Sequence, residues 1–236
     1  MNSQFRNIGI VTRPQTPEIG KTLHALVQFL HGAGINIYLD ADSVNEGTAA
    51  AEDIPLCQII TKATLGLKCD LVIVLGGDGT FLSVARELAP HKVPVIGVNQ
   101  GHLGFLTQVS HDNMVEGLGA MLGGSYLSEE RILLEVAMER RSERPLALND
   151  VVLSRGGAGQ MIEFEVFING EFVYTQRSDG LIVSTPTGST AYALAAGGPI
   201  LQASLCAFTL VPICPQSMTN RPIAIADTCE IEILVT

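Results

Sequence analysis

A carboxylate set among glycines follows a short apolar segment near the middle of the chain. Residues 71–75 are all aliphatic and lie between polar residues and glycines, which predicts a strand buried on both faces. The residues directly after this strand are Gly76, Gly77, Asp78, Gly79 and Thr80. Apolar residues at helical spacing from position 81 onward predict a helix, whose N-terminal N–H groups favour a phosphate.

Glycines in the loop between this strand and helix let backbone N–H groups approach a ligand closely. The residues expected to bind phosphate are Gly76, Gly77, Gly79 and Thr80. Thr80 would cap the helix or bond a phosphate oxygen. Asp78 differs from them because a carboxylate repels phosphate, and it suits a group that handles a proton or a metal ion. The alternative is an ordinary glycine turn in which Asp78 only caps the helix.

Composition and charge limit the possible function. The 236 residues are enough for one large domain or two small ones, and 47% hydrophobic residues predict a globular protein. A net charge of −10 argues against general binding to nucleic acids or anionic membranes. No apolar run reaches the ~18 residues of a membrane span, and residues 1–7 do not look like a signal peptide. The five cysteines form no Cys-X-X-Cys pair, so we expect reduced thiols and a cytoplasmic protein.

The first half of the chain alternates predicted strands with predicted helices. Strands are predicted at residues 7–13, 35–39, 71–75 and 93–99. Helices are predicted from Thr16 to about residue 30, after Thr80, and at residues 114–121. This alternation predicts an α/β domain with a mostly parallel, Rossmann-like sheet, where ligands gather at the carboxyl ends of the strands.

Two other segments of this half could carry function. Gly101 and Gly104 lie beside Phe105 after the strand at 93–99, which suits the close approach of a ligand. Phe105 would stack on a base or belong to the core. The polar residues from position 40 to 47 predict a loop, which we favour over a metal site at Asp40 and Asp42.

The second half reads mainly as strands. Apolar residues alternate from 162 to 168 and again from 172 to 176, with Asn169-Gly170 between them, which predicts a hairpin. Further strands are predicted at residues 181–184, 208–213, 223–226 and 229–235. We therefore expect an α/β domain at residues 1–128 and an all-β-rich, β-sandwich-like domain at 129–236.

Two stretches of the second half suit nucleotide binding. Asn149 and Asp150 interrupt an apolar run and offer groups that could bind sugar hydroxyls, although a simple turn explains them too. Arg177 could neutralise a phosphate and Asp179 could accept from an amine. The small and hydroxyl residues at 185–192 predict a short helix that opens at Thr190, either a second phosphate cradle or merely a capped helix.

Residues 76–80 resemble a signature shared by NAD kinases, diacylglycerol and sphingosine kinases, and phosphofructokinases. In all of these the resemblance implies a nucleotide-dependent kinase. The stretches at 101–105, 149–150, 177–180, 185–192 and 197–199 resemble the remaining signatures of bacterial NAD kinases, in the same order. The lipid kinases and phosphofructokinases share only the first signature, so the chain is identified as a member of the NAD kinase family.

The resemblance implies transfer of the γ-phosphoryl group of ATP, or of polyphosphate, to the 2′-hydroxyl of the adenosine ribose of NAD, with a divalent cation such as Mg²⁺. It implies that Asp78 takes the proton from that hydroxyl or orients it. The residues expected to contact NAD are Asp78, Gly79, Phe105, Asn149, Asp150, Gln160, Arg177, Asp179, Thr187, Thr190, Ala191, Tyr192, Ala193, Leu194 and Ala195. Gln160 corresponds to a position that contacts the ligand of the second subunit.

The expected partners are NAD and ATP, with a homodimer or homotetramer and no nucleic acid or membrane. Family members extend past the equivalent of Thr236, so the last strands of the second domain are expected to be missing. A lipid kinase or a non-catalytic protein that binds NAD or NADP remains the alternative.

Overall fold

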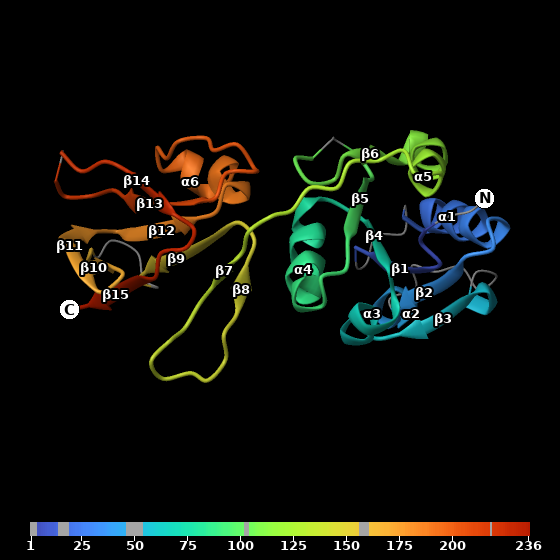
Figure 1. The fold of residues 1–236 in the computed structure, drawn as a ribbon, viewed down its shortest axis with the longest axis horizontal. Coiled ribbons are helices and arrows are strands. Elements are labelled where there is room, and N and C mark those ends of the chain that lie inside the picture. The colour runs from blue at the N-terminus through green and yellow to red at the C-terminus, as the bar shows by residue number, and fades with distance from the viewer. Residues whose placement is uncertain (1–3, 14–18, 46–53, 102–103, 156–160, 218) are drawn as a thin grey trace. The chain divides into compact units, whose positions relative to one another are not determined.

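The computed structural model describes residues 4–13, 19–45, 54–101, 104–155, 161–217 and 219–236 (Figure 1). The chain divides into two compact units, Met1–Leu127 and Ser128–Thr236. In the described part of the chain, no helix has the length and apolarity needed to cross a membrane.

A parallel sheet of six strands forms the centre of the first unit, in the order β3-β2-β1-β4-β5-β6. The strands are β1 (Asn7–Thr12), β2 (Asn36–Asp40), β3 (Cys57–Ile60), β4 (Leu71–Leu75), β5 (Val95–Asn99) and β6 (Val109–Ser110). The parallel sheet confirms the α/β prediction. All five residues of β4 are buried, as expected for a strand with helices on both faces.

Helices cover both faces of this sheet. They are α1 (Ile19–Gly32), α2 (Ala41–Asn45), α3 (Lys62–Lys68), α4 (Asp78–Leu88) and α5 (Met114–Leu122), with short 3₁₀ turns η1 (Ile54–Leu56), η2 (Ala89–His91) and η3 (His111–Asn113). Alternate residues of β4 point to opposite faces. Ile73 packs with α1 and α5 in one core cluster, whereas Val72 and Val74 pack with α3 and α4 in another.

The prediction of a loop at residues 40–47 was wrong for residues 40–45. Asp40 is the last residue of β2 and only 1% exposed, and residues 41–45 form helix α2. This short helix is fastened to β1 because Ser43 Oγ accepts hydrogen bonds from Thr12 Oγ1, at 2.9 Å, and from Thr12 N, at 3.3 Å. A helix of five residues is too short to reveal its period in the sequence.

The two larger sheets of the second unit are antiparallel, with strand orders β11-β10-β15 and β14-β13-β12-β9. Their strands are β9 (Asp150–Ser154), β10 (Ile162–Ile168), β11 (Glu171–Ser178), β12 (Gly180–Ser184), β13 (Ala207–Ile213), β14 (Ile223–Ala226) and β15 (Ile231–Val235). One core cluster includes Phe164 from the first sheet and Leu181 and Leu210 from the second, which confirms the β-sandwich-like prediction.

Four smaller elements belong to the described part of this unit. Strands β7 (Leu134–Glu135) and β8 (Leu146–Ala147) pair with each other, and η4 (Thr187–Thr190) and α6 (Tyr192–Ala195) follow β12. The predicted hairpin joins β10 to β11. Its turn residues Asn169 and Gly170 have φ values of 53° and 79°, the left-handed conformation that a tight two-residue hairpin turn requires.

Candidate active site

The carboxylate of Asp78 is held by the loop that follows β5. Asp78 is the first residue of α4, and its Oδ2 accepts a hydrogen bond from the backbone N–H of Phe105 at 2.9 Å. Its Oδ1 accepts from the backbone N–H groups of Leu106, at 3.2 Å, and Thr107, at 3.1 Å, and from the Thr107 hydroxyl, at 3.0 Å. Four hydrogen bonds therefore fix the carboxylate and fasten this loop to the start of the helix.

Gly104 is needed inside this network. A Cβ at this position would overlap Asp78 Oδ1 and would lie 2.6 Å from Thr107 Oγ1. The sequence suggested a ligand as the reason for glycine here, but the approach of the Asp78 carboxylate already requires it. Phe105, the next residue, is 73% exposed, so the alternative that its ring belongs to the core was wrong.

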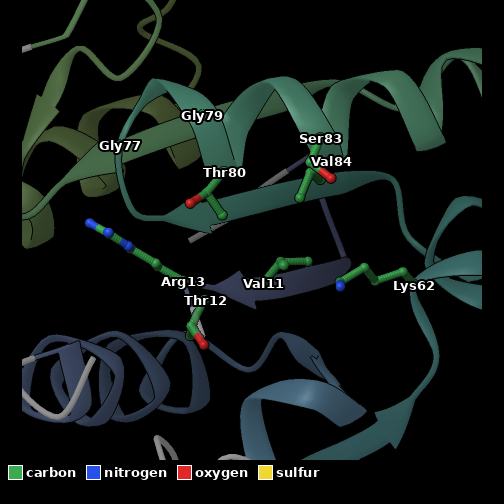
Figure 2. A pocket seen from close by; sticks show the side chains of 9 residues that line it. All are labelled: Val11, Thr12, Arg13, Lys62, Gly77, Gly79, Thr80, Ser83 and Val84. Carbon is green, nitrogen blue, oxygen red and sulfur yellow. The ribbon is translucent and has the colours of Figure 1, made fainter. Parts of the chain in front are cut away.

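A pocket of about 500 Å³ lies in the first unit, at the carboxyl ends of β1 and β4. Its lining residues are Val11, Thr12, Arg13, Lys62, Gly77, Gly79, Thr80, Ser83 and Val84 (Figure 2). Three of the four residues predicted to bind phosphate are among them. The Asp78 side chain instead faces the 105–107 loop.

The lining of this pocket suits an anion. Among the lining residues that the structure describes, two are charged, Arg13 and Lys62, and both are positive; Figure 2 shows them on either side of Val11. A Cβ added at Gly77 or Gly79 would meet nothing within 4 Å, so packing of the protein does not require glycine there. Glycine leaves this space to a ligand, beside the N-terminal N–H groups of α4.

Two helix starts differ from their predictions. Helix α4 begins at Asp78 and its N-cap is Gly77, so Thr80 lies in the first turn and does not cap the helix. Gly76 packs against the Thr80 side chain, since a Cβ at position 76 would lie 2.9 Å from Thr80 Oγ1. The short helix predicted to open at Thr190 is divided in two, because the 3₁₀ turn η4 ends at Thr190 and helix α6 begins only at Tyr192. For α4 the predicted start was too late because Gly79 itself belongs to the first turn of the helix.

In the second unit, the segment 148–149 lies against the segment 185–188. Thr185 N donates to Asn149 O at 2.9 Å, and Thr185 Oγ1 donates to Leu148 O at 2.5 Å. Gly188 packs so closely that a Cβ would overlap the Asn149 carbonyl. Asp150 begins β9, and burial raises the pKa of its carboxyl group.

Arg131 also belongs to this region, although no pattern in the sequence singled it out. Its Nη1 donates to Thr187 Oγ1 at 3.3 Å, and its Nη2 donates to Glu129 Oε2 at 2.6 Å. It lies 56 positions from Thr187, outside any recognisable motif. Arg131 therefore orients the hydroxyl of one predicted NAD-binding residue.

The remaining predicted residues vary in exposure. Arg177 and Asp179 are exposed on either side of the buried Ser178, at the turn from β11 into β12. In the helical stretch, Tyr192, Leu194 and Ala195 are exposed and Ala193 is buried. Thr190 and Ala191 are half-buried. Gln160 lies outside the described residues.

Comparison with known proteins identifies the family. Residues 8–126 match the family model of the ATP-NAD kinase N-terminal domain, and residues 148–236 match that of the ATP-NAD kinase C-terminal domain. An NAD kinase of Neisseria meningitidis is 68% identical over 239 aligned positions, which cover 100% of this chain and 81% of that protein.

Two solved structures share the fold. Yeast NADH kinase complexed with NADH has a TM-score of 0.85 and 27% sequence identity, and the match covers 98% of this chain and 68% of that one. An NAD kinase from Archaeoglobus fulgidus in complex with ATP has a TM-score of 0.75 and 24% sequence identity. This match covers 97% of this chain and 80% of that one. With both family models matched along its length, the chain belongs to the NAD kinase family.

Proposed function

We propose that the chain phosphorylates the 2′-hydroxyl of the adenosine ribose of NAD, with ATP as donor, to give NADP. The observation that carries this proposal is the fixed carboxylate of Asp78 at the start of α4, next in sequence to the glycines of a pocket that suits an anion. The NAD kinase family models, which match residues of both units, support this function and do not favour a lipid kinase.

The pocket of the first unit would receive the phosphate groups of the donor. Its lining offers the guanidinium of Arg13, the ammonium of Lys62 and the hydroxyls of Thr80 and Ser83. These groups and the N–H groups of α4 stabilise negative charge that spreads over the transferred phosphoryl group. Inorganic polyphosphate presents the same phosphate chain and is a second possible donor.

Mg²⁺ would enter with the donor as part of the substrate. Among the described residues, no group of three His, Cys, Asp or Glu side chains could hold a metal ion. This agrees with the usual behaviour of Mg²⁺, which binds through substrate phosphates and water with one or two carboxylates. When bound, it neutralises charge on the β- and γ-phosphate oxygens.

Asp78 would act as the general base. Its carboxylate takes the proton of the ribose 2′-hydroxyl while the 2′-oxygen forms a bond to the γ-phosphorus, and the bond from that phosphorus to the bridging oxygen breaks to release ADP. The hydrogen bonds from Phe105 and Thr107 keep the carboxylate in one orientation. Positioning of this kind is the main source of catalysis in phosphoryl transfer.

The second unit would supply most contacts to NAD. Asn149 and Asp150 would hold the ribose, and Arg177 would neutralise phosphate charge. The other residues proposed to contact the dinucleotide are Gly79, Phe105, Gln160, Asp179, Thr187, Thr190, Ala191, Tyr192, Ala193, Leu194 and Ala195. We also propose a homodimer or homotetramer that works in the cytoplasm, where both substrates are available.

An assay of NADP formation tests the proposed function. Purified protein is incubated with NAD, Mg²⁺ and either ATP or polyphosphate, and NADP is measured with an NADP-specific dehydrogenase. We expect NADP with at least one donor and none without donor. A folded protein that binds NAD but forms no NADP with either donor would be a non-catalytic binder, and the proposal would be wrong.

A further inference from the structure

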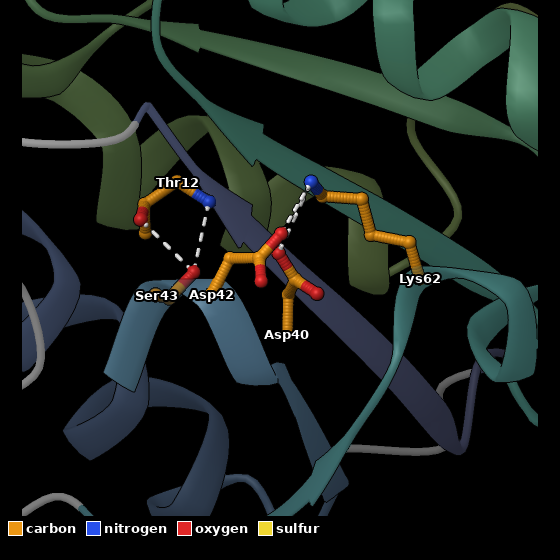
Figure 3. Close-up of polar contacts among 5 residues, drawn as sticks. All are labelled: Thr12, Asp40, Asp42, Ser43 and Lys62. Carbon is orange, nitrogen blue, oxygen red and sulfur yellow. Dashed lines mark hydrogen bonds and ion pairs between the residues drawn. The ribbon is translucent and has the colours of Figure 1, made fainter. Parts of the chain in front are cut away.

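Lys62 lines the pocket and also interacts with two carboxylates, those of Asp40 and Asp42 (Figure 3). Its Nζ donates a hydrogen bond to Asp42 Oδ2 at 2.8 Å and lies 3.8 Å from Asp40 Oδ2. Lys62 is the first residue of α3, whereas the two carboxylates belong to the end of β2 and the start of α2. Three separate elements therefore converge on one ammonium group at the pocket wall.

The ammonium of Lys62 keeps capacity for a ligand. A lysine ammonium has three N–H donors. Among the described residues, its one hydrogen bond goes to Asp42, since the 3.8 Å separation from Asp40 is too long for a second. The side chain is 31% exposed and lines the pocket, so donors remain for an anion there.

Asp40, when ionised, also helps to position this ammonium. Its side chain is only 2% exposed, and its Oδ2 has no hydrogen-bond partner among the described residues. A buried carboxylate of this kind attracts a nearby cation strongly, because little water screens the two charges. Asp42 fixes Lys62 by a hydrogen bond, and Asp40 adds attraction from the interior.

We propose that Lys62 is a donor-binding residue, whose ammonium, positioned by Asp42 and Asp40, contacts the phosphate chain of the phosphoryl donor in the pocket. This inference rests on the proposed function, because it assigns the pocket to the donor rather than to NAD. The recognised chemistry is a chain of linked phosphates, which ATP and inorganic polyphosphate share. Lys62 takes part in no covalent step and supplies charge and hydrogen bonds only.

The test compares Lys62→Met with Lys62→Arg, which keeps the charge, and with Lys68→Met, the same change at the exposed end of the same helix. For each protein we measure KM for ATP and for NAD, and, by calorimetry, the dissociation constants of ATP and of inorganic tripolyphosphate. Lys62→Met should raise KM for ATP and both dissociation constants about tenfold, the effect of one charge-assisted hydrogen bond. KM for NAD should stay within twofold of the parent value. Lys62→Arg, which keeps the positive charge, should retain most of the affinity for ATP and tripolyphosphate. Lys68→Met should behave like the parent.

A double variant tests the role of Asp42 as a positioning residue. Asp42→Ala alone should raise KM for ATP a few-fold and leave KM for NAD unchanged. Combined with Lys62→Met, it should add nothing further, because Asp42 acts only through Lys62. Additive losses in the double variant would contradict this positioning role.

The outcomes separate this inference from the proposed function. If the parent forms NADP and Lys62→Met binds ATP and tripolyphosphate as tightly as the parent, the inference is wrong and the proposed function stands. Weakened binding of ATP alone would place Lys62 on the nucleoside and would also overturn it. If the parent forms no NADP, calorimetry still decides whether Lys62 binds a phosphate chain.

Discussion

Asp78 and Thr107 are joined by two hydrogen bonds to the same oxygen, from the Thr107 backbone N–H at 3.1 Å and from its hydroxyl at 3.0 Å. The carboxylate proposed as general base therefore also fastens the loop after β5 to the start of α4. A substitution of Asp78 will change both chemistry and local stability. The two effects are separable because a substitution of Thr107 changes local stability but leaves the carboxylate of Asp78 in place.

Asp78→Asn should lower the rate of NADP formation by about 10²–10⁴, because an amide cannot take the proton of the ribose hydroxyl. It should also lower the free energy of unfolding by about 1–2 kcal/mol, since the new NH₂ group would face loop N–H donors. The rate is measured with saturating ATP and NAD, and stability by urea unfolding. A variant that forms NADP as fast as the parent would exclude Asp78 as the base.

The matched control for this substitution is Thr107→Val, which removes one donor to Asp78 and keeps the carboxylate. Thr107 is fully buried, and its hydroxyl also accepts from Asn99 Nδ2 at 3.2 Å. We expect a similar loss of stability with a rate less than tenfold below that of the parent. Equal loss of rate in the two variants would mean that Asp78 acts only by fastening the loop.

Gly104→Ala should displace the Asp78 carboxylate, because the added Cβ would overlap Asp78 Oδ1. Both the hydrogen bonds to the loop and the orientation of the base would change. We expect a loss of about 1–3 kcal/mol in stability, typical of overpacking, and a fall in kcat of at least tenfold. Gly32→Ala, at the end of α1, is the control, since a Cβ there would also meet nothing within 4 Å.

Phe105→Ala should weaken NAD binding with little loss of stability. The ring is 73% exposed, so its removal uncovers little apolar surface, and the free energy of unfolding should change by less than about 0.5 kcal/mol. Stacking of a base on an aromatic ring contributes about 1–3 kcal/mol, so KM for NAD should rise at least fivefold. An unchanged KM for NAD would remove Phe105 from the proposed binding site.

Several elements were predictable because local sequence determines them. The continuous apolar run of β4 indicates burial on both faces, and Asn169-Gly170 supplies the two left-handed residues of a hairpin turn. Helices α2 and α3, of five and seven residues, were missed because neither shows a clear hydrophobic period. Asp40 was expected in a solvated loop because a charged residue is rarely buried, but it is the last residue of β2 and is buried.

The contacts around the predicted site residues could not be derived from the sequence. Asp78 bonds to residues 27–29 positions away, and Thr187 to Arg131, 56 positions away. Spacing indicates which residue types share a motif, but it does not indicate which distant backbone groups pair with them. The position of Lys62 against Asp42 likewise depends on how α3 follows β3, an arrangement without a local signal.

The buried carboxyl group of Asp40 should make stability depend on pH. Burial, offset in part by Lys62, raises its pKa from 3.8 to about 6. Between pH 4 and 6 the folded protein therefore holds a proton that the unfolded chain has released, so stability falls as pH rises and the loss is complete above about pH 7. Asp40→Asn removes this loss and should stabilise the protein by about 2 kcal/mol at pH 7.5, but by almost nothing at pH 4.

Urea unfolding at pH 4, 5, 6 and 7.5 gives the free energies for the parent, Asp40→Asn and a control, Asp42→Asn. Asp42 shares Lys62 as a partner but its side chain is 57% exposed, so solvent screens it and its substitution should change stability by less than about 0.5 kcal/mol at every pH. The free energy of unfolding of Asp40→Asn minus that of the parent should grow from pH 4 to pH 7.5. If it does not grow, burial does not penalise the charge of Asp40. Lower stability of Asp40→Asn at pH 7.5 would show that attraction to Lys62 outweighs the cost of burial.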